Sequence, residues 1–230
     1  MKEKYKKVEK LIWQNRFDEA KEIILHDQSI VHYKDESGHT LLHAVPQKQL
    51  EFLKFLISKG ADVNASFSTE DEICTTPLMF AAQSEDYEAV EELLNAGAEI
   101  NYFNDQGHTA FMASIGNIKI MDYLYEKGAN INFSKSGENS ALWWAVAKPS
   151  SDALNWLFDK GIDKQFYDLK LKDALEYSIE RYDEVVKELN TSKLGEERLE
   201  KEKSELYKCM QILTIHKIDY LNINREIKLE

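Results

Sequence analysis

Apolar residues recur along most of the chain in short stretches that have the spacing of an α-helix. In one of them, Ala81, Val90 and Leu93 would form an apolar face, with a small residue that lets neighbouring helices approach closely. Thr76 and Pro77 come just before it. A threonine hydroxyl can accept hydrogen bonds from the free N–H groups at a helix start, and proline suits the first helical position. The pattern predicts a helix that begins at Pro77 and a second helix after a turn.

A phrase of five residues is written three times with small changes, as GADVN at 60–64, GAEIN at 97–101 and GANIN at 128–132. Each copy should mark the end of a helix, because glycine enters the left-handed conformation of a helix end without steric cost. Together with Gly161, these glycines are 37, 31 and 33 residues apart. A period of this size indicates a repeat protein, in which each unit is a helix, a turn, a second helix and a projecting loop or β-hairpin.

Signatures of a helix start follow the glycines at a regular distance. Thr109, Ser140 and Asp173 each come twelve residues after the preceding glycine of the series, whereas the gap between Gly60 and Thr76 is 16 residues. We expect the first helix of a unit to begin at each of these positions.

The residues at two helix starts resemble the pattern T-P-L-H-x-A of the ankyrin repeat, because residues 40–44 read TLLHA and residues 76–82 read TPLMFAA. The resemblance covers nearly the whole chain, although Gly195 falls in a segment that the pattern does not explain. It implies an all-α fold with short hairpin loops, in which antiparallel helix pairs stack as an ankyrin-repeat α-solenoid. It also implies a binding function, since a solenoid of this kind presents an extended concave surface.

We expect one solenoid over residues 1–230, because the repeated phrase continues through most of the chain. Its parts are a degenerate N-terminal cap at 1–34, repeats at 35–70, 71–103, 104–134 and 135–167, an irregular C-terminal repeat at 168–221 and a tail at 222–230.

The irregular C-terminal repeat contains a charged insertion at 182–205, where thirteen of 24 residues are charged and Gly195 interrupts the pattern. A helix at 173–181 should pair with a helix at 206–215. The insertion is expected to be exposed, either as a helical hairpin or as an extension of both helices. We interpret it as a solvated capping device, and a separate docking element is the alternative.

The sequence carries few signs of catalysis. It has no glycine-rich phosphate loop and no Cys-x-x-Cys pair, and Cys74 and Cys209 are expected to be reduced thiols. His43 is interpreted as a hydrogen-bonding residue at a helix start, and His39 and His108 as polar hairpin residues. We therefore expect no enzyme activity, no cofactor and no metal. A cryptic enzyme or a binder of small ligands is the alternative.

The charge of the chain bears on its partner. The formal net charge is −12, and the stretch between Lys59 and Lys119 has eleven acidic residues but no Lys or Arg. Such a field repels nucleic acid and anionic membranes and speeds the encounter with a basic protein. No stretch is as apolar as a signal peptide or a membrane helix, so we expect a cytoplasmic monomer that binds a protein with a basic surface.

Aromatic residues are common at positions expected on the concave surface, and aromatic side chains are among the best anchors of protein interfaces. We also predict contacts for acidic residues in the loops, but not for those on the outer helices, where charged side chains are normally solvated. The predicted partner-binding residues are Tyr33, Phe67, Phe80, Tyr102, Phe103, Phe133, Trp144, Phe166, Tyr167 and Tyr177, with the acids Glu70, Asp71, Glu72 and Asp105. The alternative is that hairpin aromatics pack on each other, and Trp143 is expected in the core.

These observations favour a noncatalytic protein–protein interaction module. A second interpretation is an inhibitor or immunity-type protein that neutralises a basic enzyme or toxin, a role that the resemblance permits because some small acidic ankyrin proteins look like this chain.

Overall fold

The chain folds into helices that form two compact units. The computed structural model describes residues 1–45, 47–67, 75–135, 140–162, 167–191 and 196–227. Unit 1 consists of Met1–Ser114 and Asp122–Ala129, and unit 2 consists of Ile115–Met121 and Asn130–Glu230.

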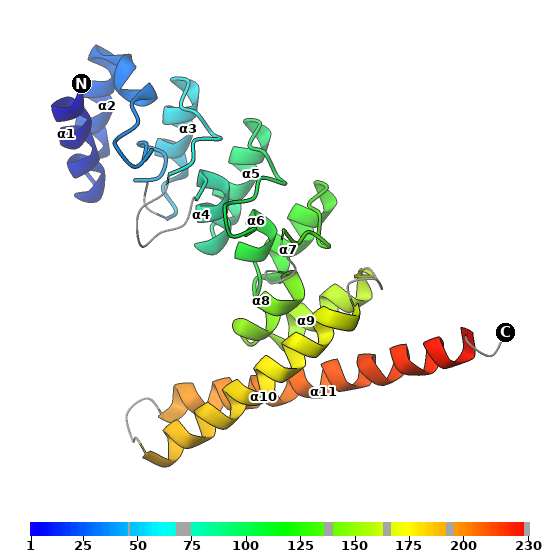
Figure 1. Cartoon of the computed structure of the whole chain (residues 1–230). Coiled ribbons are helices and arrows are strands. Elements are labelled where there is room, and N and C mark those ends of the chain that lie inside the picture. The colour runs from blue at the N-terminus through cyan, green and yellow to red at the C-terminus, as the bar shows by residue number, and fades with distance from the viewer. Residues whose placement is uncertain (46, 68–74, 136–139, 163–166, 192–195, 228–230) are drawn as a thin grey trace. The chain divides into compact units, whose positions relative to one another are not determined.

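Short helices make up unit 1, and longer ones close unit 2 (Figure 1). Unit 1 contains α1 (Lys2–Trp13), α2 (Phe17–His26), the 3-10 helix η1 (Gln28–His32), α3 (Leu50–Ser58), α4 (Pro77–Gln83), α5 (Tyr87–Asn95) and α6 (Ala110–Ala113). The boundary between the units crosses α7 (Ile118–Glu126). Unit 2 contains α8 (Ala141–Ala147), α9 (Ser151–Asp159), α10 (Tyr167–Thr191) and α11 (Glu196–Ile227). The described part of the chain is therefore all-α, as expected.

Three of the predicted helix starts are confirmed. The hydroxyl oxygen of Thr76 accepts a hydrogen bond from the N–H of Met79 at 3.3 Å, and Pro77 is the first residue of α4. Thr109 accepts in the same way at the start of α6, and Ser140 does so at the start of α8. These hydroxyls satisfy N–H groups that have no partner within the helix.

Two other predicted helix starts are wrong. Residues 41–44, after Thr40, form a single turn and not an α-helix, and the sequence explains why. Pro46 follows almost at once, and a proline disfavours the helical conformation of the residue before it. Helix α10 begins at Tyr167, six residues before Asp173. No glycine or proline lies between Gly161 and Gly195, so nothing in the sequence prevents the helix from including the residues before Asp173.

The repeated five-residue phrase has two structural roles in unit 1. Its glycine ends a helix, as predicted, since Gly60, Gly97 and Gly128 have φ angles of 84°, 91° and 94°. Its asparagine joins one repeat to the next, and the sequence did not suggest this role. The side-chain amide of Asn64 donates to the carbonyl oxygen of Gly97 at 3.2 Å, and that of Asn101 donates to Gly128 at 3.1 Å. The copies at 60–64 and 97–101 therefore each supply both a helix end and a link to the next repeat.

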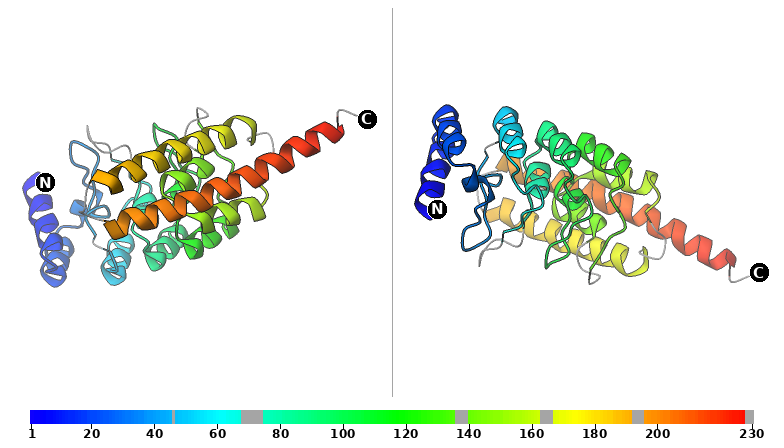
Figure 2. Two further views of the ribbon diagram at one scale, coloured as in Figure 1. Left: turned by 90° about the horizontal axis from the view of Figure 1, so that it is seen from below. Right: turned by 90° about the horizontal axis from the view of Figure 1, so that it is seen from above.

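In unit 2, α10 and α11 lie side by side as an antiparallel pair, while α10 also contacts α8 and α11 contacts α9 (Figures 1 and 2). The predicted insertion is an extension of both helices where it is described. Its expected exposure is wrong in part, because Val185 and Leu199 are buried with Leu206 in a cluster that Tyr182 and Leu189 flank.

The start of α9 is held by a residue of α11. Glu205 accepts hydrogen bonds from the N–H and the hydroxyl of Ser151 at 3.3 and 2.8 Å, where a carboxylate also suits the positive end of the helix. Burial raises the pKa of the nearby Cys209 thiol to about 12, so this residue is an unreactive thiol.

Candidate partner-binding surfaces

Two of the predicted aromatic residues of unit 1 are clearly exposed. Phe80, on α4, has 37% of its surface exposed, and Phe103 has 43%. Phe103 forms an isolated β-bridge with Thr109, at the base of the hairpin turn. The turn itself is held by Asn104, whose side-chain oxygen accepts from the N–H groups of Gln106 and His108 at 3.1 and 2.8 Å. Hydrogen bonds thus fix the backbone that carries Phe103, which reduces the entropy lost when the ring is bound.

The remaining predicted residues of unit 1 are less uniform. Tyr102 is half-buried and Asp105 is exposed in the hairpin turn. Tyr33 is half-buried, with its ring 5.0 Å from that of Tyr5 on α1. Phe67 has only 7% of its surface exposed, and its ring packs edge-on against those of His39 and His43, at 5.0 and 4.8 Å. The Phe67 ring therefore stabilises unit 1 and offers little area to a partner.

His43 is a buried polar residue beside Phe67. Its Nδ1 atom lies 3.0 Å from the hydroxyl of Thr40 and accepts from the Thr40 N–H at 3.2 Å, which bears out its interpretation as a hydrogen-bonding residue. Burial lowers the pKa of His43 to about 4, and the charge of His39 adds to this effect. The carbonyl groups of Thr75 and Ala65 act in the opposite direction without outweighing burial. His43 is therefore neutral at pH 7.

In unit 2, one tryptophan connects two of the predicted residues. The ring of Trp143 lies 5.1 Å from that of Trp144 and 5.6 Å from that of Tyr177 on α10. Both tryptophans are half-buried, although Trp143 was expected in the core, and Phe133 is half-buried too. The Nζ atom of Lys148 lies 5.9 Å from the centre of the Trp144 ring. The three neighbouring rings form a partly exposed aromatic cluster.

Several predicted residues cannot be placed. Glu70, Asp71, Glu72 and Phe166 lie outside the described residues, as does the side chain of Tyr167, although its backbone begins α10.

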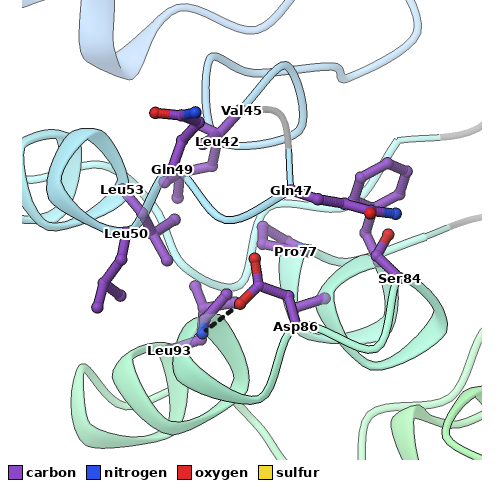
Figure 3. Close-up of a pocket in the computed structure, with 13 residues that line it drawn as sticks. Leu42, Val45, Gln47, Gln49, Leu50, Leu53, Pro77, Ser84, Asp86 and Leu93 are labelled. Atoms are coloured by element: carbon purple, nitrogen blue, oxygen red, sulfur yellow. Dashed lines mark hydrogen bonds between the residues drawn. The ribbon is translucent and has the colours of Figure 1, made fainter.

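The structure shows one feature that the sequence did not indicate, a pocket in unit 1 between two neighbouring repeats (Figure 3). Its apolar walls come from the 41–44 turn with the residue after it, and from three helices: Leu42 and Val45, Leu50 and Leu53 of α3, Pro77, Phe80 and Ala81 of α4, and Ala89 and Leu93 of α5. Gln47, Gln49, Ser84 and Asp86 line its polar part. Its walls come from residues far apart in the sequence, so no local pattern could reveal it.

Asp86 shapes this pocket from the turn between α4 and α5. One oxygen of its carboxylate accepts from the N–H of Ala89 at 3.2 Å and caps α5, the bond drawn in Figure 3. The other accepts from the backbone N–H of Lys48 at 2.6 Å. Asp86 thereby ties the interhelix turn of one repeat to that of the next.

The described residues show no group of three or more His, Cys, Asp or Glu side chains that could hold a metal ion. Among the same residues, no helix combines the length and the apolar character needed to span a membrane.

Capped helix pairs, glycine helix ends and hairpin turns that recur with one period define a helical repeat protein. The family described as ankyrin repeats (3 copies) matches residues 41–135 and 78–173, which together make up more than half of the chain. The chain belongs to the ankyrin repeat family. Ankyrin repeats are in general modules for protein–protein interaction and are typically noncatalytic.

Similar proteins come from a virus and from animals. An ankyrin repeat protein of Fowlpox virus (strain NVSL) is 32% identical over 117 residues, which are 50% of this chain and 34% of that protein. The nuclear factor NF-kappa-B p105 subunit of Gallus gallus is 27% identical over 157 residues, or 64% of this chain and 16% of the relative. The neurogenic locus notch homolog protein 1 of Xenopus laevis is 28% identical over 134 residues, or 56% and 5%. The chain thus spans about a third or less of the length of these relatives.

Proposed function

We propose that this chain is a noncatalytic module that binds a protein partner with a basic surface through aromatic side chains. The observation that carries the proposal is the exposure of Phe80 and Phe103, at 37% and 43%, on backbone that hydrogen bonds hold in place. Large rings that stay exposed on a fixed backbone are suited to anchor a partner, because they bury much area and lose little entropy. In unit 2 the cluster around Trp143 supports the same role for Trp144 and Tyr177.

The charge of the chain supports the choice of a basic partner. Asp105 is exposed two residues after Phe103. The stretch of sequence around both residues, from Lys59 to Lys119, has no Lys or Arg in between. Opposite charges across an interface mainly raise the association rate and fix the choice of partner. We include Glu70, Asp71 and Glu72 in the proposed surface on their sequence position alone.

The test begins with affinity capture from the native host and identification of the retained protein by mass spectrometry. Its affinity is then measured by calorimetry for Phe103→Ala and Trp144→Ala. Each change should weaken binding at least fivefold, about 1 kcal/mol, and leave the melting temperature nearly unchanged. The matched control is Trp13→Ala on α1, an exposed residue outside the proposed surface, which should bind normally. Wild-type affinity in both test variants would show that the aromatic surface is assigned incorrectly.

The role of charge is tested separately. Replacement of Glu70, Asp71 and Glu72 by neutral residues should slow association and reduce its dependence on salt, while the dissociation rate changes little. Neutral residues at Glu3, Asp18 and Glu22, which are exposed on α1 and α2, serve as the control with the same loss of charge. Equal association rates for the two variants would contradict a contact role for the loop acids.

A further inference from the structure

The pocket of Figure 3 lies between a repeat whose first helix is reduced to a single turn and a repeat whose first helix is complete. Residues 41–44 make a single turn, whereas α4 in the next repeat runs from Pro77 to Gln83. The second turn of α4 therefore has no helical turn opposite it, and Phe80, Ala81 and Ser84 line an open space. This space lies at the interhelix turns, because Gln47, Gln49 and Asp86 also line it.

The size and the walls of the pocket limit what it can hold. Its volume of about 30 Å³ is far below the roughly 300 Å³ or more of a site for a cofactor or a small-molecule ligand. Leucine, valine, proline and alanine side chains form most of the walls, so an apolar group gains from entering. The end of one aliphatic side chain matches this space, while the rest of the ligand stays outside the pocket.

Polar groups at the rim of the pocket indicate that the ligand with that side chain is a polypeptide. Gln47 is exposed and Gln49 is half-buried, and neither side-chain amide has a hydrogen-bond partner among the residues that the structure describes. A primary amide can both donate to and accept from a peptide backbone. Two such amides beside an apolar hollow can orient an extended segment whose side chain enters the hollow.

The charge around the pocket favours basic residues next to the inserted side chain of the ligand. Glu85 and Glu88 are exposed in and after the turn between α4 and α5, and Glu51 is exposed in the first turn of α3. The whole stretch that forms the α4 and α5 walls has no Lys or Arg. Two lysines are near these acids: Lys48 is exposed between Gln47 and Gln49 in the sequence, and the Nζ atom of Lys54 lies 3.9 Å from the carboxylate of Glu92. With Asp86 and Glu92 the acids number five against these two lysines, so the surroundings complement positive charge on the ligand.

We propose that this pocket is a docking site for a polypeptide segment that inserts one aliphatic side chain, Leu, Ile or Met, next to a Lys or Arg. The inference rests on the proposed function only in taking a polypeptide as the ligand. The site shares Phe80 with the proposed aromatic surface, but it lies at the interhelix turns and does not include the hairpin that carries Phe103.

The test uses a phage-displayed library of random dodecapeptides, panned against the whole chain. The enriched peptides should share an aliphatic residue beside Lys or Arg, and their affinities are measured by fluorescence polarisation. Ala89→Leu, which fills the pocket from α5, should weaken them at least tenfold. Leu50→Ala, which removes a wall from the other side, gives an independent reading if Ala89→Leu lowers the melting temperature. Leu25→Ala is the control, since Leu25 is exposed on α2 away from the pocket.

Phe103→Ala separates this inference from the proposed function, because it should leave the affinity of pocket peptides unchanged. A natural partner that loses affinity with Phe103→Ala but not with Ala89→Leu would refute the docking site and keep the proposed function. The docking site is also refuted if panning enriches no peptide, or if the peptides bind Ala89→Leu as tightly as wild type. Self-association of the chain that Ala89→Leu abolishes would show that the occupant is a second copy and not a basic partner.

Discussion

His43 should make the stability of unit 1 depend on pH between about 6.5 and 4. Its pKa is about 4 in the folded chain, against an ordinary value of 6.5, because burial disfavours the charged imidazole. Between these values the unfolded chain binds a proton that the folded chain does not. The contribution of the neutral His43 to stability is therefore fully present above pH 6.5 and is lost as the pH is lowered towards 4.

The magnitude follows from the difference between the two pKa values. About 2.5 pH units at about 1.4 kcal/mol each give a full effect between about 3 and 4 kcal/mol, of which about 3 kcal/mol is lost between pH 7 and pH 4. This is a large fraction of the roughly 5–15 kcal/mol that stabilises a typical domain. The effect should be visible as a shift in the midpoint of urea unfolding measured at pH 7, 6, 5 and 4.

The matched variant is His43→Met, because Met79 and Met112 occupy the corresponding position after Thr76 and Thr109. Carboxylates whose pKa is lowered in the folded chain are present in both proteins, so their contribution cancels in the comparison, except at Asp62, whose pKa the charge of His43 helps to lower. Wild type should lose about 3 kcal/mol more than His43→Met between pH 7 and pH 4. Since His39 lies 5.2 Å from His43, the comparison is repeated with His39→Gln in both proteins. Parallel pH profiles would refute the assignment of a neutral, buried His43.

Two further changes test the backbone of unit 1. Lys48 has a φ of 63°, which costs a side-chain-bearing residue roughly 1 kcal/mol, so Lys48→Gly should raise the free energy of unfolding by about 0.5 kcal/mol after the entropy of glycine is included. Lys54→Gly within α3 should lower it by about 1 kcal/mol, and urea unfolding that ranks the two alike would contradict the strain at Lys48. Asn64→Ala removes the bonds to the Gly97 carbonyl and from the Glu99 N–H, so thermal unfolding should show a loss of about 1 kcal/mol; an unchanged midpoint would mean that solvent replaces both bonds.

Local chemistry could be predicted from the sequence wherever a single residue decides it. Thr76 and Ser140 cap helices, and Gly97 ends one, because the required hydroxyl or the left-handed conformation is a property of that residue. The pocket could not be predicted in this way. Its walls run from Leu42 to Leu93, and it depends on how an interrupted turn packs against a complete helix.

The exposure of the hairpin aromatics shows a finer limit of sequence reasoning. Phe67 and Phe103 each form an isolated β-bridge, but Phe67 pairs with Thr75, the residue before the helix cap Thr76, while Phe103 pairs with the helix cap Thr109 itself. Successive residues of an extended strand point to opposite faces, so a difference of one residue reverses the direction of the ring. Phe67 is accordingly buried and Phe103 exposed. Composition alone treats the two rings as equivalent.

The same reasoning explains why the charge of the C-terminal helices is a poor guide to their exposure. A helix pair can carry many charges and still bury an apolar seam, because only about one residue in each turn faces the other helix. Arg181 shows where part of the charge goes, since it bonds to Glu202 of α11 at 2.8 Å while it also contacts two glutamates of its own helix. Val185 and Leu199 fill the seam. The part of the pair beyond Tyr182 therefore has an apolar core of its own.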